Sequence, residues 1–320
     1  MMKTLNILSP ALLISLIISC EKIEKPVIPD DTEKLIEKFY PGDPAEFEIS
    51  ATFPDNTNTT RNILIEDFTG HLCNNCPAAA IIAKDIEANN LGRVFVIGVH
   101  APGGKNSFQS VTKDYPTDFT TEAGTAYAKN IPGYVGNPSG LISRKNYDGK
   151  IWLFKESWGN ATNAIKTSNK LIADIQIKVN HYPETGGVFV HYQVEAKQAI
   201  DTALKVIVLL VEKKVVSPQK LEDGTKKEDY EHHNVLSGII SGAYLDETDG
   251  SIKYSSFFGD NIGTLSNGEK KTGIAINGLN EMNTKRKINA DGGNDLTVFA
   301  LLVNEVSYEI YQVVTQDIEF

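Results

Sequence analysis

The sequence predicts a two-part fold, in which an α/β domain is followed by an all-β sandwich. Residues 63–99 read as strand, helix and strand, which indicates a βαβ unit in a mostly parallel sheet. From Ile175 onward, apolar residues alternate with polar ones, and Gly, Asn, Asp and Pro turns separate the runs, as is typical of antiparallel strands. At 320 residues, the chain has room for both domains.

The first residues form a separate unit. Lys3 precedes a mostly apolar stretch, 5–18, which is too short to span a bilayer core of about 30 Å as a helix. The stretch leads into Ile17-Ile18-Ser19-Cys20, which resembles the bacterial lipobox, whose cysteine is acylated. We therefore expect a signal peptide over 1–19 and attachment to a membrane through a lipid on Cys20. The alternative is a plain secretory signal with an incidental cysteine.

Residues 20–60 are expected to connect this anchor to the folded body. Residues 21–32 are rich in Glu, Lys, Pro and Asp, which predicts a tether. Residues 45–53 alternate Phe47, Ile49 and Phe53 with polar residues, which indicates an additional strand.

Two cysteines stand at the junction of the first strand and the first helix of the α/β part. Residues 63–65 have strand character, and residues 78–89 read as a helix. We expect Cys73 and Cys76 on the first helical turn, where free N–H groups and the helix dipole stabilise a thiolate on Cys73. A C-x-x-C pair in this position is typical of thioredoxin-like redox proteins.

The resemblance to thioredoxins extends beyond the cysteines. Thioredoxins carry a buried Asp, then Phe, four further residues and Cys-x-x-Cys, and this chain has Asp67 and Phe68 in the same register. The segment Gly136-Asn137-Pro138-Ser139 resembles the one that holds a cis-proline against the thiols. The chain departs from the pattern at Leu72, where Trp is usual, and at Asn74-Asn75, where Gly-Pro is usual. These departures bear on the redox potential rather than on the fold.

Together with the N-terminal signal and the C-terminal half, these motifs resemble the Omp-twenty-eight-related outer-membrane lipoproteins of Bacteroidota-type bacteria. The resemblance implies an α/β thioredoxin-like domain over 61–170, followed by an all-β immunoglobulin-like sandwich over 171–320. It also implies a lipid-anchored protein of the cell outer membrane that faces the periplasm or the cell surface.

The resemblance assigns roles to four residues. Cys73 would attack a partner disulfide and Cys76 would resolve the mixed disulfide. Asp67 would move protons to or from Cys76, because burial raises the pKa of a carboxyl group. Pro138 would present backbone groups to an extended substrate segment. The alternatives are a turn-capping acid for Asp67 and a trans turn proline for Pro138.

His71 and His100 are accessory candidates near the same edge of the sheet, with a solvated surface His and a structural His as the respective alternatives. The spacing from Cys73 to Pro138 is longer than thioredoxin needs, so we expect a cap over the thiols, built from the loop 101–115 and a helix over 117–130. The pair His232-His233 is predicted to lie in a solvated loop rather than at a metal site, because adjacent side chains on a strand point to opposite faces and do not easily share one ion.

Three interpretations of the Cys73–Cys76 pair remain open: a redox-active pair, an inert structural disulfide, and a metal site. A structural zinc site normally needs four ligands, and the chain has no second C-x-x-C. A c-type haem is excluded, because Pro77 rather than His follows Cys76. We therefore expect no metal and no cofactor.

Two functions are consistent with the sequence. The first is thiol-disulfide exchange on exported or surface proteins, with protein thiols, disulfides or other envelope proteins as partners. The second is a non-enzymatic binding or structural lipoprotein whose disulfide is structural. A net charge of −10 argues against binding to nucleic acid, whose phosphates require a basic face.

Overall fold

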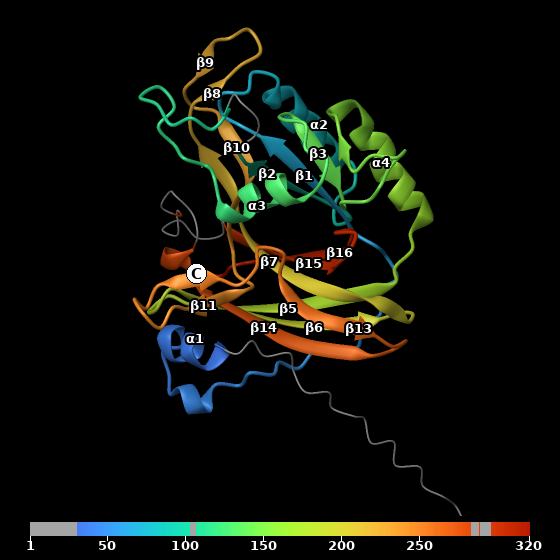
Figure 1. The fold of residues 1–320 in the computed structure, drawn as a ribbon, viewed down its shortest axis with the longest axis vertical. Helices are drawn as coiled ribbons and strands as arrows, with labels where there is room; N and C mark the ends of the chain where they lie inside the picture. The colour runs from blue at the N-terminus through green and yellow to red at the C-terminus, as the bar shows by residue number, and fades with distance from the viewer. Residues whose placement is uncertain (1–30, 103–106, 283–287, 289–295) are drawn as a thin grey trace, which may run out of the picture.

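The computed structural model describes residues 31–102, 107–282, 288 and 296–320. The predicted signal peptide and Cys20 lie outside these residues, as does most of the predicted tether. The described part is a mixed α/β structure with one large sheet and few helices. In Figure 1, the α/β elements lie above the β layers, and α1 (Thr32–Phe39) lies below them.

The α/β part contains the strands and helices that the sequence places around the cysteines. Its elements are β1 (Ile63–Thr69), α2 (Cys76–Ala88), β2 (Val94–His100), α3 (Glu122–Asn130), β3 (Ser139–Ile142), β4 (Trp152–Leu153) and α4 (Lys155–Ser168). β1 pairs in parallel with β2 and antiparallel with β3. α2 and α4 pack on one face of this sheet through an apolar cluster that includes Ile63, Ala83 and Trp158. α3 contributes to the core on the other face through Ala123 and Tyr127.

The rest of the chain is almost entirely β structure. Its strands are β5 (Ala173–Tyr182), β6 (Gly187–Ala196), β7 (Ile200–Val216), β8 (Gln219–Lys220), β9 (Lys226–Lys227), β10 (Glu231–Ile239), β11 (Ala243–Leu245), β12 (Ile252–Tyr254), β13 (Asp260–Leu265), β14 (Lys270–Gly278), β15 (Leu296–Asn304) and β16 (Ile310–Asp317). Two short 3₁₀ helices occur at Pro44–Glu46 and Leu279–Glu281. A three-stranded sheet, β14-β6-β5, packs against the large sheet through a buried core that includes Val190, Tyr192 and Val208.

The large sheet runs through both parts of the molecule. Among the described residues, its order is β16-β15-β7-β10-β2-β1-β3-β4, and β13 pairs with β7. β10 joins the two parts, because it pairs with β7 over most of its length and with β2 at Val235 and Gly98. The same continuity holds in the core, where one cluster contains Phe68 and Val99 together with Leu209. Residue 170, near which the sequence predicts a domain boundary, lies between α4 and β5, and the sheet and the core continue from one part to the other.

Several local predictions were wrong. Residues 47–62 contain no strand, and α1 packs through Leu35, Ile36 and Phe39 against the face of the three-stranded sheet that carries Phe189. The helix expected over 117–130 begins only at Glu122, where Thr121 caps it by accepting a bond from the Gly124 N–H. Residues 152–173 read as one long helix in the sequence, but they form β4 and then α4, and β5 starts at Ala173.

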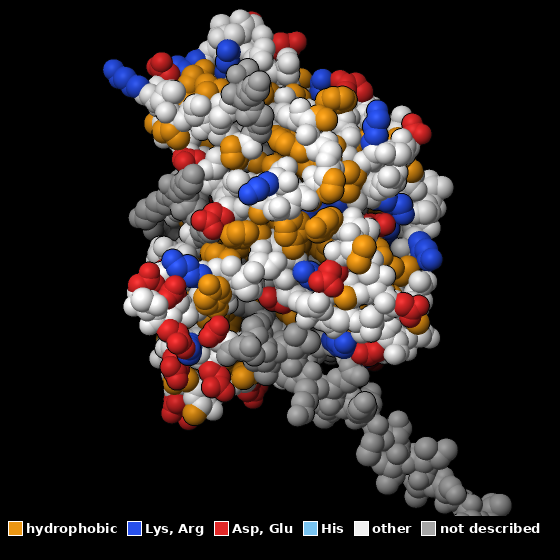
Figure 2. Space-filling model, viewed as in Figure 1, with side chains coloured by type: hydrophobic (Ala, Val, Ile, Leu, Met, Phe, Trp, Pro, Cys, Tyr) orange, Lys and Arg blue, Asp and Glu red, His pale blue; other side chains and the backbone are white. Residues whose placement is uncertain are grey.

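The surface in the view of Figure 1 is polar around an apolar centre. Figure 2 shows hydrophobic side chains gathered across the middle of this face, and Asp and Glu side chains concentrated at its lower left, around α1. No helix in the described ranges is both long and apolar enough to cross a membrane.

Candidate redox site

The two cysteines form a disulfide at the point where the chain leaves β1 and enters α2. The Cα atoms of Cys73 and Cys76 are 5.4 Å apart. α2 begins at Cys76. Cys73 ends the preceding turn, residues 70–73, which we call the cysteine turn, and the Cys73 carbonyl accepts a bond from the Cys76 N–H at 3.2 Å. The expectation that both sulfurs lie on the first helical turn is thus wrong for Cys73. The positive end of the helix still adjoins this turn.

Both cysteines are almost fully buried. Cys73 is 2% exposed and Cys76 is 1% exposed. Part of the cover is the loop before α3, whose Phe108 carbonyl accepts a bond from the Leu72 N–H at 3.1 Å. The Gln109 side chain in the same loop donates to the Thr69 carbonyl at 2.6 Å. The loop expected to cap the thiols therefore does contact the cysteine turn.

A second cover comes from a segment that the sequence did not connect with the site. Residues 217–230 leave β7, form the short strands β8 and β9, and return to β10. The Lys220 N–H donates to the His71 carbonyl at 2.8 Å, and the Gln219 side-chain amide donates to the Cys73 carbonyl at 3.1 Å. We call residues 217–230 the hairpin segment. No local pattern announces these contacts, which join positions almost 150 residues apart.

Asp67 lies on β1 directly opposite Gly98 of β2 and Gly140 of β3. Asp67 is 3% exposed, and its Oδ1 atom has no hydrogen-bond partner among the residues that the structure describes. Burial raises the pKa of this carboxyl from 3.8 to about 7. A carboxyl group with a pKa near neutrality can take up or release a proton under ordinary conditions.

The Pro138 segment lies beside the end of β1. The Asn137–Pro138 peptide bond is cis, and the next residue, Ser139, pairs with Phe68. The Asn137 side chain donates to the Thr69 carbonyl at 2.7 Å, which ties the segment to the strand that leads into the cysteine turn. The structure therefore brings the Pro138 segment and the cysteine turn to the same end of β1.

The histidines of this region are more buried than the sequence suggested. His71 is buried rather than solvated, its Nε2 atom lies 3.1 Å from the Ser110 carbonyl, and burial lowers its pKa. His100 ends β2 and stacks on Phe119, with ring centroids 4.4 Å apart. His232 is also buried, and its ring centroid lies 4.6 Å from that of Phe119. The prediction that His232 and His233 lie in a loop is wrong, because both belong to β10.

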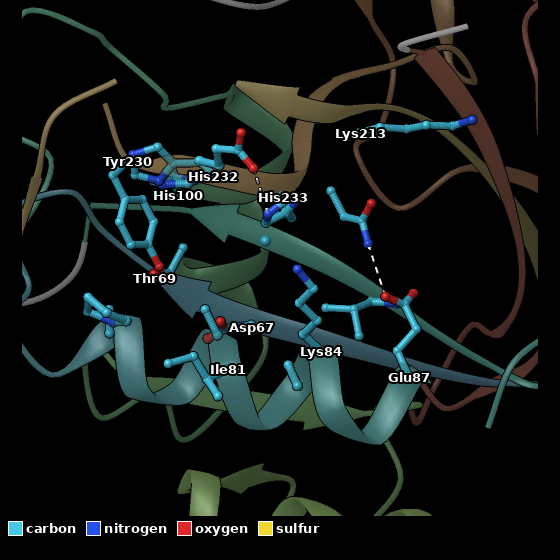
Figure 3. A pocket seen from close by; sticks show the side chains of 18 of the residues that line it. Asp67, Thr69, Ile81, Lys84, Glu87, His100, Lys213, Tyr230, His232 and His233 are labelled. Carbon is cyan, nitrogen blue, oxygen red and sulfur yellow. Dashed lines mark hydrogen bonds and ion pairs between the residues drawn. The ribbon is translucent and has the colours of Figure 1, made fainter. Parts of the chain in front are cut away.

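A pocket of about 990 Å³ opens between α2 and β10. Figure 3 shows Ile81, Lys84 and Glu87 on the α2 side, Tyr230, His232 and His233 on the opposite side, and Asp67 at the back. Cys76 and Gln219 also line the pocket. Burial and the charge of Asp67 raise the pKa of Tyr230, so these two groups influence each other across the pocket.

Glu87 closes the pocket at the end where β10 leaves β2. One Glu87 carboxylate oxygen accepts a bond from the Val96 N–H at 3.0 Å, and the other accepts a bond from the Asn234 side chain at 3.4 Å. The carboxylate thus satisfies a backbone donor of β2. No group of three or more His, Cys, Asp or Glu side chains suited to hold a metal occurs in the described part of the chain.

Comparisons with known proteins show similarity of fold. No family model matches the chain, and a search of the curated proteins finds no match. Among solved structures, HBP35 of Porphyromonas gingivalis aligns with a TM-score of 0.55 and 16% identity, over 81% of this chain and 76% of that one. At this identity, the likeness shows a shared fold alone.

Two further alignments have TM-scores below 0.5 and support no inference. Protein AGR_C_4864 of Agrobacterium tumefaciens aligns at 0.45 with 10% identity, over 81% of this chain and 95% of that one. A domain of the outer membrane lipoprotein Omp28 from Porphyromonas gingivalis aligns at 0.27 with 14% identity, over 46% of this chain and 88% of that one.

Proposed function

We propose that residues 61–170 form a thioredoxin-like module that exchanges disulfides with exported proteins, and that the β part acts as an immunoglobulin-like docking or spacing module. The observation that carries this proposal is the buried Asp67 carboxyl, which lines the same pocket as Cys76 of the Cys73–Cys76 disulfide. A purely structural disulfide has no need of a buried carboxyl group that ionises near neutrality.

The reaction begins with attack by a partner thiolate on the Cys73 sulfur. The bond between Cys73 and Cys76 breaks, the electron pair leaves on the Cys76 sulfur, and protonated Asp67 supplies the proton that this thiolate takes up. A second thiolate of the same partner then attacks the partner sulfur of the mixed disulfide. Cys73 leaves as a thiolate, so the partner is oxidised to a disulfide and the pair is reduced to a Cys76 thiol and a Cys73 thiolate.

The partner is a protein with two thiols, or with a disulfide when the same steps run in reverse. Val135 is 66% exposed and lies three residues before Pro138. Val111, in the loop that covers the cysteine turn, is 52% exposed. Exposed apolar side chains beside the Pro138 segment and on the loop that covers the cysteine turn are suited to docking an extended segment of another protein.

A second function, in which the disulfide is structural and the protein is a binding lipoprotein, is favoured by one observation. Both cysteines are almost fully buried beneath the loop before α3 and the hairpin segment, so the disulfide is closed to a partner in this conformation. Reactive cysteines are usually partly exposed. The redox potential separates the two functions.

The decisive measurement is a redox titration of the full chain carrying Cys20→Ala, in which free thiols are counted by mass after alkylation in glutathione buffers. Exchange predicts a reversible midpoint between roughly −120 and −270 mV. The Cys73→Ser variant serves as the control and should show no transition in this range. A pair that stays oxidised below about −300 mV would establish the structural disulfide and reject the exchange function.

We also propose that the protein is held at the bacterial outer membrane by a lipid on Cys20. The support is the lipobox-like sequence before Cys20, together with the apolar stretch 5–18. In cells, the wild-type chain is expected to sediment with membranes and to incorporate a labelled fatty acid, whereas Cys20→Ala should lose the label. The Cys73→Ala variant should keep it. Incorporation into Cys20→Ala at the wild-type level would reject the anchor.

A further inference from the structure

The hairpin segment is attached to the cysteine turn through the Lys220 N–H, which donates to the His71 carbonyl, and through the side chain of Gln219. This side chain is 2% exposed, and its amide nitrogen lies within hydrogen-bond distance of the carbonyl oxygens of Cys73 at 3.1 Å, Lys220 at 2.9 Å and Gly70 at 3.4 Å. The amide therefore joins the hairpin segment to both ends of the turn that holds Cys73. A carbonyl buried in this way loses its partner if the segment lifts, unless water enters.

The other attachments of the hairpin segment are at its base and its tip. At the base, the Ser217 and Thr117 hydroxyls are 2.7 Å apart. At the tip, Lys226 forms an ion pair with Asp114 at 3.2 Å, in which the Asp114 side chain is 74% exposed. An exposed ion pair contributes little to stability. The tip is therefore weakly held, and the attachments between the tip and the base are the Gln219 side chain and the Lys220 N–H. Of these two, the Gln219 bond is made by a side chain and can be removed by substitution.

The cover matters for chemistry because disulfide exchange requires access to sulfur. The incoming thiolate must reach the Cys73 sulfur, and its rate of attack depends on access. With Cys73 almost fully buried, the closed conformation offers no such path. The observed rate is then the rate of the open form multiplied by the fraction of molecules that are open.

We propose that Gln219 is a positioning residue that holds the hairpin segment closed over the Cys73–Cys76 disulfide, so that only a partner able to displace this segment exchanges with it rapidly. The identity of such a partner as a protein dithiol rests on the proposed function. The closure of the hairpin segment over the disulfide, which we call the gate, does not depend on the proposed function, because a small reductant also measures access to a structural disulfide.

The test is the rate of reduction of the disulfide by dithiothreitol in the full chain carrying Cys20→Ala, with thiols trapped and counted by mass. Gln219→Glu keeps the shape of the side chain but replaces the donor with an oxygen that the Cys73 carbonyl repels. We expect reduction to be roughly fivefold to tenfold faster, the factor that corresponds to one lost buried hydrogen bond. Gln176→Glu is the matched control, because its amide bonds the Pro54 carbonyl far from the disulfide, and it should react at the wild-type rate.

The free energy of unfolding of the oxidised variants separates opening of the hairpin segment from general destabilisation. Faster reduction of Gln219→Glu, at an unfolding free energy close to that of Gln176→Glu, supports the gate. Equal rates for Gln219→Glu and the wild type in folded protein would overturn it.

A second comparison does not depend on whether Gln219→Glu folds. The wild-type disulfide should be reduced at least roughly tenfold more slowly in the folded protein than in urea, because the open fraction is small. Equal rates in the two conditions would refute the gate. If Gln219→Glu is reduced faster while the redox midpoint lies outside the exchange range, the gate stands and the proposed function fails.

Discussion

Replacing Asp67 by Asn is expected to raise the free energy of unfolding by up to about 4 kcal/mol at pH 8 and to leave it nearly unchanged at pH 4. In the folded protein, burial raises the Asp67 pKa from 3.8 to about 7, so the folded state retains a proton that the unfolded state has released. Wild-type stability therefore falls as pH rises from about 4 to about 7, and the full cost of burying the carboxylate is present above pH 7. The amide carries no charge and avoids this cost.

Urea unfolding of the oxidised protein between pH 4 and pH 9 measures this difference. Asp260→Asn is a matched control from the β part, because burial also raises the pKa of Asp260, to about 6. Asp260→Asn should raise the free energy of unfolding at pH 8 by less than Asp67→Asn does, and it should leave disulfide exchange unchanged. Asp67→Asn should slow exchange with a dithiol protein about 100-fold at pH 7. A pH-independent stability difference between Asp67→Asn and the wild type would contradict the raised pKa.

Replacing Arg144 by Leu is expected to lower the free energy of unfolding by about 3 to 5 kcal/mol. Arg144 and Glu66 form a buried ion pair, and each residue is 1% exposed. The Arg144 Nε and Nη2 atoms donate to the two Glu66 carboxylate oxygens at 2.8 and 2.7 Å. The guanidinium also lies over the Tyr127 ring, 4.4 Å from its centroid. Loss of Arg144 leaves the Glu66 charge buried without its partner, and that unpaired charge causes most of the destabilisation.

Removing both charges tests whether the unpaired Glu66 charge causes the loss of stability. Glu66→Leu combined with Arg144→Leu should recover much of the loss, because no unpaired charge is then left in the core. Lys213→Ala, which removes the exposed ion pair between Lys213 and Asp317, should cost less than about 1 kcal/mol. If the double variant is as unstable as the sum of the two single variants, the buried charge is not the cause.

The sequence determined the local features of this protein that are encoded over a few neighbouring residues. The apolar run before Asp67 is a buried strand, the residues after Cys76 form a helix, and alternation from Ile175 onward marks β strands. These predictions succeed because strand and helix periodicities arise from the geometry of consecutive residues. The burial of Asp67 was expected only through the resemblance to thioredoxins.

Only the tertiary structure decided what covers the site and how the two parts join. The contact of Gln219 with Cys73, and the pairing of β10 with both β7 and β2, connect residues that are far apart in sequence. His71 reads as an exposed loop residue in the sequence but is buried in the fold. Side-chain burial depends on which distant segments pack over a position, and no local periodicity records that packing. For this reason the sequence identifies a C-x-x-C pair before a helix, whereas only the fold shows that both cysteines are buried.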